Sequence, residues 1–314
     1  MASTSVTECA HCGAAATLQC AGCRDAPEYQ PGDAGGVHYC GRDCQISHWP
    51  SHKSRCINLR RRRKLLRTAL ILKAALLTYR EMVYDIPLTK IERRDGTLYL
   101  HQRPRAPTTV FQPGPFPDHL TTHVEHREAA LTVNQCTLAM ALLGPLTRKL
   151  LAGIASTLEV LDLQLGRRPM PARLIPGPDP SSCPHTVIQV SRSGAGETWI
   201  LDLTGCQYGF RDVLVPYDRY LADRACPSLQ RPVPYDATET KDLDYFATLP
   251  FLTHTRAQRE NLNRERQSRL RFAEFVNTRV RAEVLEGSTV EFQQKREAFT
   301  SMLKRHLEKP PGGN

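Results

Sequence analysis

The chain has 314 residues, of which 40% are hydrophobic and 24% are charged. This composition is ordinary for a soluble protein with a real core, in one large domain or two or three smaller ones. The longest apolar stretch, residues 65–77, contains Arg67 and Lys73 and is too short for a membrane-spanning helix. The net charge of +10 suggests nucleic acid, but the excess lies in residues 53–67 and the rest is nearly balanced.

The N-terminal segment is expected to depend on metal for its fold. Its first eight residues lack the basic and apolar regions of a secretory signal peptide, so we expect an intracellular protein, in the cytoplasm, the nucleus or both. Cysteines in such a reducing environment are metal ligands or free thiols rather than disulfides. Seven of the 11 cysteines lie in residues 1–56, among short polar segments that cannot form a hydrophobic core.

The spacing of these cysteines is typical of zinc ligands. Two Cys-x2-Cys pairs precede two pairs spaced four residues apart, which share a helix face, and Pro50 is expected to separate two short helices there. Eight ligands complete two tetrahedral sites that are structural, because protein fills every position. His52 completes the register, and His48 is the competing histidine. The predicted ligands of the two zinc ions are Cys9, Cys12, Cys20, Cys23, Cys40, Cys44, His52 and Cys56.

This ligand series, with Tyr39 before Cys40 and the segment 44–53, resembles the MYND family of zinc fingers, and we assign residues 1–58 to it. The resemblance implies an interleaved arrangement, in which the first and third pairs hold one zinc and the second and fourth hold the other. Spacing alone also permits neighbouring pairs to share an ion. MYND fingers typically bind short proline-rich peptides in a shallow groove, to which the resemblance assigns Gln45 and Trp49.

A tryptophan face stacks well on proline rings, so this peptide-binding role is chemically sensible. The alternative is that Trp49 packs in the small core of the module.

Residues 59–86 are predicted to form a basic amphipathic linker helix. Leu65, Leu72 and Tyr79 lie on one apolar stripe, and Pro87 ends the helix. The basic residues 60–64 fit a nuclear localisation signal, a phosphate-binding patch or a solvated helix start, and we favour the last. No aromatic residues alternate with the arginines, so sequence-specific nucleic-acid binding is not expected.

Residues 87–250 are predicted to form an α+β body with antiparallel strands, and residues 251–314 a charged helical tail with a disordered end at 310–314. Within the body we expect a hairpin at residues 91–100, a proline-rich loop at 104–117 and a pair of helices within 128–165. Two strands are expected at 185–190 and 198–203. The predicted turns and breaks are Asp95-Gly96, Gly144-Pro145, residues 193–196 and Gly287-Ser288.

Three body residues have the types and order of a cysteine-dependent catalytic site. Cys136 opens an apolar helix, His185 begins a strand, and Asp202 lies on the next strand. A thiol at a helix N-terminus beside an imidazole has a lowered pKa, and an acid orients the imidazole. These residues resemble the core of transglutaminase-like and related papain-fold proteins. The alternative is that Cys136 is an ordinary core residue.

Residues 5–250 as a whole resemble fungal proteins with an N-terminal MYND finger, through the basic helix ending at 79–81, the hairpin and the segment 202–210. The leading hypothesis is a zinc-dependent interaction protein, whose MYND module docks proline-rich peptides and whose body is a scaffold. The alternative is an acyl-transfer enzyme that uses Cys136, His185 and Asp202. A SET-type lysine methyltransferase is set aside, because we find no Asn-His-x-Cys segment and no second cysteine-rich stretch.

Overall fold

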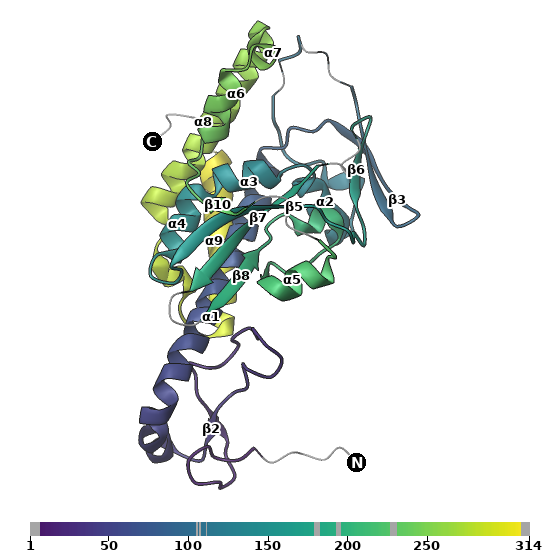
Figure 1. Cartoon of the computed structure of the whole chain (residues 1–314). Helices are drawn as coiled ribbons and strands as arrows, with labels where there is room; N and C mark the ends of the chain where they lie inside the picture. The colour runs from purple at the N-terminus through teal and green to yellow at the C-terminus, as the bar shows by residue number, and fades with distance from the viewer. Residues whose placement is uncertain are drawn as a thin grey trace.

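One long helix, α1 (Arg42–Met82), connects the cysteine-rich module to the rest of the molecule (Figure 1). The computed structural model describes residues 7–104, 106, 108–110, 112–178, 183–192, 196–226 and 231–308. Most of the turn predicted at 193–196 and the chain end predicted at 310–314 lie outside these residues. No helix in the described ranges is long and apolar enough to cross a bilayer.

The helix α1 is continuous through Pro50, so the prediction of two short helices separated by this proline is wrong. Proline has no N–H to donate to the carbonyl of Ile46, one turn earlier. Both residues are exposed, and water can satisfy the carbonyl that the proline leaves free. The apolar stripe predicted farther along the helix is confirmed, because Leu65, Leu72 and Tyr79 are fully buried.

The centre of the body is an antiparallel sheet of five strands in the order β10-β5-β7-β8-β9. Their bounds are β5 Thr157–Leu163, β7 His185–Arg192, β8 Glu197–Leu201, β9 Leu214–Pro216 and β10 Val233–Pro234. Side chains alternate between its faces. Trp199 and Leu201 pack with α1 and other helices in the main core, whereas Ile200 packs with Tyr220 of α5 (Tyr217–Asp223) on the opposite face.

A second sheet has three strands in the order β3-β4-β6. The predicted hairpin is confirmed as β3 (Leu88–Arg94) and β4 (Thr97–Gln102), and both turn residues, Asp95 and Gly96, have positive φ. The strand β6 (Ala172–Ile175) pairs with β4 in parallel. The smallest sheet pairs β1 (Leu18–Gln19) with β2 (His38–Tyr39) inside the cysteine-rich module.

The prediction that residues 128–165 are helical is wrong for its C-terminal part, which is strand β5. This strand pairs with β7 along its whole length, a long-range contact that a local pattern does not reveal. A further break comes at Asn134, whose positive φ separates α2 from α3. The predicted break at Gly144-Pro145 is confirmed. The three helices are α2 Val124–Thr132, α3 Cys136–Leu142 and α4 Gly144–Leu151.

Two of the C-terminal helices, α8 (Arg256–Arg279) and α9 (Thr289–Glu308), contribute to the same core as the sheet, and α9 packs along α1 (Figure 1). Phe272 and Phe299, from two different helices of residues 251–314, are buried beside the α1 stripe. The predicted break is present as Gly287, with a φ of 102°. The remaining elements are α6 Lys241–Ala247, α7 Pro250–Thr253 and the short 3-10 turns η1 Asp118–Leu120, η3 Gly205–Tyr208 and η4 Ala282–Leu285.

A buried ion cluster joins the cysteine-rich module, α1 and the five-stranded sheet. The guanidinium of Arg62 donates two hydrogen bonds of 2.8 Å to Asp33 of the module. It also donates to Glu197 Oε1 of β8, at 2.8 and 3.0 Å. The other oxygen of Glu197 accepts from Arg192 at 2.6 Å and from Trp199 Nε1 at 3.2 Å. Each carboxylate is therefore paired with a positively charged arginine and hydrogen-bonded by it, as buried charges require.

The prediction of a solvated helix start in the basic run 60–64 is wrong for Arg62, which lies in the buried cluster. Just beyond the run, Arg67 is also buried and donates to the carbonyls of Leu285 and Gly287 at 2.9 and 2.8 Å. Arg60 and Arg61 are exposed. Charge on a helix is usually solvated, but here partners far along the chain replace the water.

Replacing Arg62 with methionine should lower the free energy of unfolding by about 2 kcal/mol, because it removes charge-assisted hydrogen bonds from two partly or fully buried carboxylates. Replacing its exposed neighbour Arg61 with methionine should change it by less than about 0.5 kcal/mol. Urea denaturation at fixed zinc concentration measures both values. Equal losses for the two variants would contradict the role of the cluster.

Candidate functional site

The first ligand cluster contains Cys9, Cys12, Cys40 and Cys44. A tight turn, closed by the Gly13 N–H bond to the Cys9 carbonyl at 2.9 Å, brings the first pair together. The second pair lies just before α1 and in its first turn. The Sγ–Sγ distances are 3.6, 3.4 and 3.7 Å for the 12–40, 40–44 and 12–44 pairs. Four sulfurs at about 2.3 Å from one zinc would be about 3.8 Å apart, so the cluster fits a tetrahedral ion.

The second cluster contains Cys20, Cys23, His52 and Cys56, all buried. The last two are four residues apart on α1 and point to the same side of the helix. Cys20 Sγ and Cys56 Sγ are 3.7 Å apart, and Cys23 Sγ is 3.2 Å from His52 Nε2. The four ligand atoms lie within 4.8 Å of one another, which fits a zinc ion held by three thiolates and one imidazole.

The two clusters decide the alternatives that the spacing left open. The ligand pairs are interleaved, because each cluster combines a pair from the N-terminal loops with a pair at α1. His52 is the histidine of the second cluster. The competing His48 makes a hydrogen bond of 3.0 Å between its Nδ1 and the Tyr39 hydroxyl, and its ring stacks on that of His52. Protein supplies four ligands to each ion, so both sites are structural.

Residue 22 has to be glycine, because two ligand sulfurs of the second cluster lie close to its backbone. A Cβ at this position would lie 2.4 Å from Cys56 Sγ and 3.7 Å from Cys20 Sγ. Any larger residue would therefore displace a zinc ligand.

Gln45 and Trp49 lie on α1, and they line a cavity together with Cys20 and Cys56 of the second cluster. Trp49 is 40% exposed, and the covered part of its ring meets the ring of the zinc ligand His52 edge-on, with centroids 6.1 Å apart. The cavity has a volume of about 220 Å³, and its lining also includes Gly22, Ile57 and Arg60. The cavity is thus lined on one side by an aromatic ring, and two of the zinc-binding cysteines also line it.

The structure brings Cys136, His185 and Asp202 together in the body. Cys136 is the first residue of α3, which contacts β7, where His185 is the first residue. His185 Nε2 lies 2.9 Å from Asp202 Oδ1, and both residues are almost completely buried. The other ring nitrogen, Nδ1, has no hydrogen-bond partner among the described residues and is available to the thiol. Cys136 itself is half-buried.

The electrostatics of these residues follow from their contacts. Burial would raise the pKa of the Cys136 thiol, but the neighbouring His185 outweighs it, and the pKa is lowered. Burial would lower the pKa of His185, but the Asp202 carboxylate raises it to about 9. By contrast, burial raises the pKa of the Cys206 thiol to about 11. The arrangement thus favours a thiolate–imidazolium pair at Cys136 and His185.

Two tyrosines that the sequence analysis did not identify complete this arrangement. The hydroxyl of Tyr220 donates to Asp202 Oδ2 at 2.8 Å, which leaves both carboxylate oxygens hydrogen-bonded. The ring of Tyr208 meets the His185 ring edge-on, with centroids 5.0 Å apart. No sequence spacing signals either contact, because both depend on how α5 and η3 pack against the sheet.

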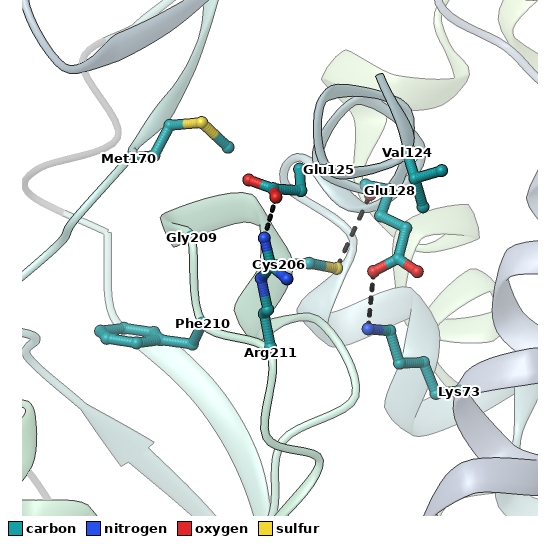
Figure 2. Close-up of a pocket in the computed structure, with 9 residues that line it drawn as sticks. All are labelled: Lys73, Val124, Glu125, Glu128, Met170, Cys206, Gly209, Phe210 and Arg211. Carbon is teal, nitrogen blue, oxygen red and sulfur yellow. Dashed lines mark hydrogen bonds and ion pairs between the residues drawn. The ribbon is translucent and has the colours of Figure 1, made fainter. Parts of the chain in front are cut away.

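A separate cavity of about 180 Å³ lies between α1, α2 and η3, on the side of η3 that carries Cys206 (Figure 2). Lys73 Nζ contacts Glu128 Oε2 at 2.7 Å, and Arg211 pairs with Glu125. Both cations drawn in Figure 2 are therefore paired with carboxylates of α2. Because the lining charges neutralise each other, the cavity indicates no particular ligand.

Comparison with known proteins agrees with the geometry of the N-terminal module. The family model of the MYND finger matches residues 9–56. A segment of 49 residues is 43% identical to the zinc finger MYND domain-containing protein 10 homolog of Drosophila melanogaster and covers 16% of this chain and 8% of that relative. The likeness is thus to a small part of the relative's length. No solved structure matched the chain.

The N-terminal module is therefore a MYND zinc finger with two structural zinc sites. The similar protein comes from an insect, and the resemblance to fungal proteins stays a prediction. The transglutaminase-like fold of the body and the boundaries predicted for the domains also stay predictions.

Purified protein should contain two zinc ions per chain, and chelation should unfold the finger because the metal supplies its folding energy. His52→Ala should retain one zinc ion, since it removes a ligand of the second cluster. His48→Ala is the matched control and should retain two. Elemental analysis of the three proteins measures this, and the opposite order of the two variants would overturn the assignment of His52.

Proposed function

We propose that this protein is a zinc-dependent interaction protein whose MYND finger docks proline-rich peptide segments of other proteins. A MYND finger implies protein–protein interaction in general. The observation that carries the more specific proposal is the exposure of Trp49 beside Gln45 at the edge of a cavity. An indole face packs well against proline rings, and the neighbouring amide supplies a donor and an acceptor for the peptide backbone.

The body acts as a scaffold in this proposal. The buried cluster at Arg62 and the continuous helix α1 support it, because they hold the finger against the sheet. A peptide that binds at Trp49 would therefore be fixed relative to the body rather than carried on a loose tether. Zinc acts only through the fold, since each ion has four protein ligands.

A peptide-array screen should yield proline-rich sequences that bind weakly, as is usual for so small an interface. Trp49→Ala should abolish their binding while the zinc content stays at two per chain. Ile46→Ala is the matched control, because Ile46 is an exposed apolar residue of the same helix that does not line the cavity. Binding that survives Trp49→Ala would contradict the proposed groove.

The second candidate function is a cysteine-dependent acyl-transfer reaction at Cys136. The specific observation in its favour is the contact series from Cys136 through His185 to Asp202, which ends in the Tyr220 hydroxyl. In such a site the thiolate would attack an acyl carbon, and the imidazolium would protonate the leaving group. Asp202 would keep the imidazole in the required orientation and charge state.

Iodoacetamide labelling against pH tests the state of the thiol. Cys136 should reach half of its maximal rate below the ordinary thiol pKa of about 8.5, and at pH 7 it should react severalfold faster than exposed Cys183. His185→Ala should remove this advantage, because the imidazolium is what lowers the pKa. Buried Cys206 should react slowest. Equal rates at Cys136 before and after the histidine substitution would leave the body as a scaffold alone.

A further inference from the structure

The cavity at Trp49 does not end at the edge of the zinc finger. A second cavity, of about 300 Å³, lies farther along α1, between this helix, the end of α4 and η4. Ile57 and Arg60 line both cavities. The two hollows therefore share a wall on α1, and the pair of them, called the groove below, extends from the finger onto the body.

We propose that this groove binds one continuous peptide segment, proline-rich where it meets Trp49 and acidic where it crosses onto the body. This inference rests on the proposed function and extends it. The finger would supply only the first half of the docking site, and the body would supply the second half.

The charge of the second cavity specifies the acidic half of the peptide. Four cationic side chains line it against a single carboxylate, that of Glu286. Lys64 pairs with Glu286, and Lys149 donates to the carbonyl of Val276 at 2.8 Å. Within the described parts of the chain, exposed Arg60 and Arg61 have neither an ion pair nor a hydrogen bond. These two guanidinium groups are free to bind carboxylates of a partner.

The positive electrostatic potential of the second cavity affects the one carboxyl group in its lining, that of Glu286. The pKa of Glu286 is lowered, first by its hydrogen bond from Lys64 and further by the charges of Arg60 and Arg63. A carboxylate from a second protein would enter the same positive field. Exposed ion pairs of this kind contribute little each, so several acidic residues are needed for a measurable gain.

The apolar side chains favour a peptide over a nucleic acid. Ile57 is 37% exposed, and Leu150 and Ile154 of the body also line the second cavity. Aliphatic side chains pack well against those of a peptide. Bases are usually bound by stacking on aromatic rings, and the second cavity has none in its lining.

The length of the groove sets the length of the peptide. Trp49 and Lys64 are about 22 Å apart along the α1 axis, from a rise of about 1.5 Å per residue. An extended chain covers this distance with about seven residues. A proline-rich core extended on one side by about seven residues with several glutamates is therefore the matching ligand.

Fluorescence anisotropy with full-length protein and synthetic peptides tests the proposal. The probes are the proline-rich sequence from the array, the same sequence extended at either end by seven residues with four glutamates, and versions with glutamine in place of glutamate. At low ionic strength the glutamate extension at one end should tighten binding about tenfold. The gain should shrink as salt is added, and glutamine should give no gain.

Arg61→Glu should remove the gain from the glutamate extension and leave binding of the short peptide unchanged. Arg256→Glu is the control for charge, because Arg256 is exposed at the start of α8 and outside the groove. A gain that survives Arg61→Glu, or that glutamine reproduces, would overturn the groove proposal while leaving the Trp49 site intact. Loss of Trp49 dependence in the short peptide would instead refute the proposed function.

The acidic extension alone and a single-stranded RNA heptamer complete the test. The acidic extension should bind weakly and lose binding in Arg61→Glu even if no proline-rich sequence is found. RNA that binds more tightly than the acidic extension, and through Arg61, would overturn the assignment of a peptide to this groove.

Discussion

The pairing of Arg62 with Asp33 and Glu197 is the interaction on which the arrangement of the molecule depends. The interior of the zinc finger is small and consists mainly of its own zinc-binding cysteines, with Val37, Tyr39 and Leu59. The buried guanidinium attaches the finger to the body by satisfying one carboxylate of the finger and one of the sheet at once. Tyr29 of the finger adds an aromatic contact with Trp199, with ring centroids 5.2 Å apart. The finger is thus attached by directional contacts, which fix its orientation as well as its position.

This attachment changes what a zinc finger can do as a recognition module. A finger on a flexible linker presents its surface alone, whereas here a cavity of the body lies next to the cavity at Trp49, and the two share Ile57 and Arg60 in their linings. Residues of α1 supply ligands for zinc, line the two cavities and form the apolar stripe of the body core. The zinc sites, the cavities and the core of the body are therefore linked through one helix.

The zinc sites could be predicted closely from sequence because ligand spacing encodes them locally. Short Cys-x2-Cys turns and helical four-residue spacing leave few arrangements, so the structure had to decide only two choices: interleaved or neighbouring pairs, and His52 or His48. The hairpin at Asp95-Gly96 was likewise a local signal. By contrast, β5 depends on pairing with a strand more than twenty residues away, and Arg62 depends on Glu197, 135 positions later. The exposure of Trp49 and the contacts of Tyr208 and Tyr220 likewise depend on the packing of segments that are distant in the sequence. Local patterns contain no information about such partners.

The continuity of α1 sets a phase between the finger and the body. In a helix each residue turns the chain by about 100°, so inserting or deleting a single residue between Cys56 and Leu65 would rotate the zinc ligands by that angle relative to the apolar stripe. Arg62 could then face Asp33 or Glu197, but not both. Sequence drift in this stretch can exchange side chains but cannot change its length without detaching the finger. The number of residues between the last zinc ligand and the first core leucine is therefore constrained, as is the spacing between the cysteines themselves. A recombination event that transferred the finger to this body would have to preserve that number.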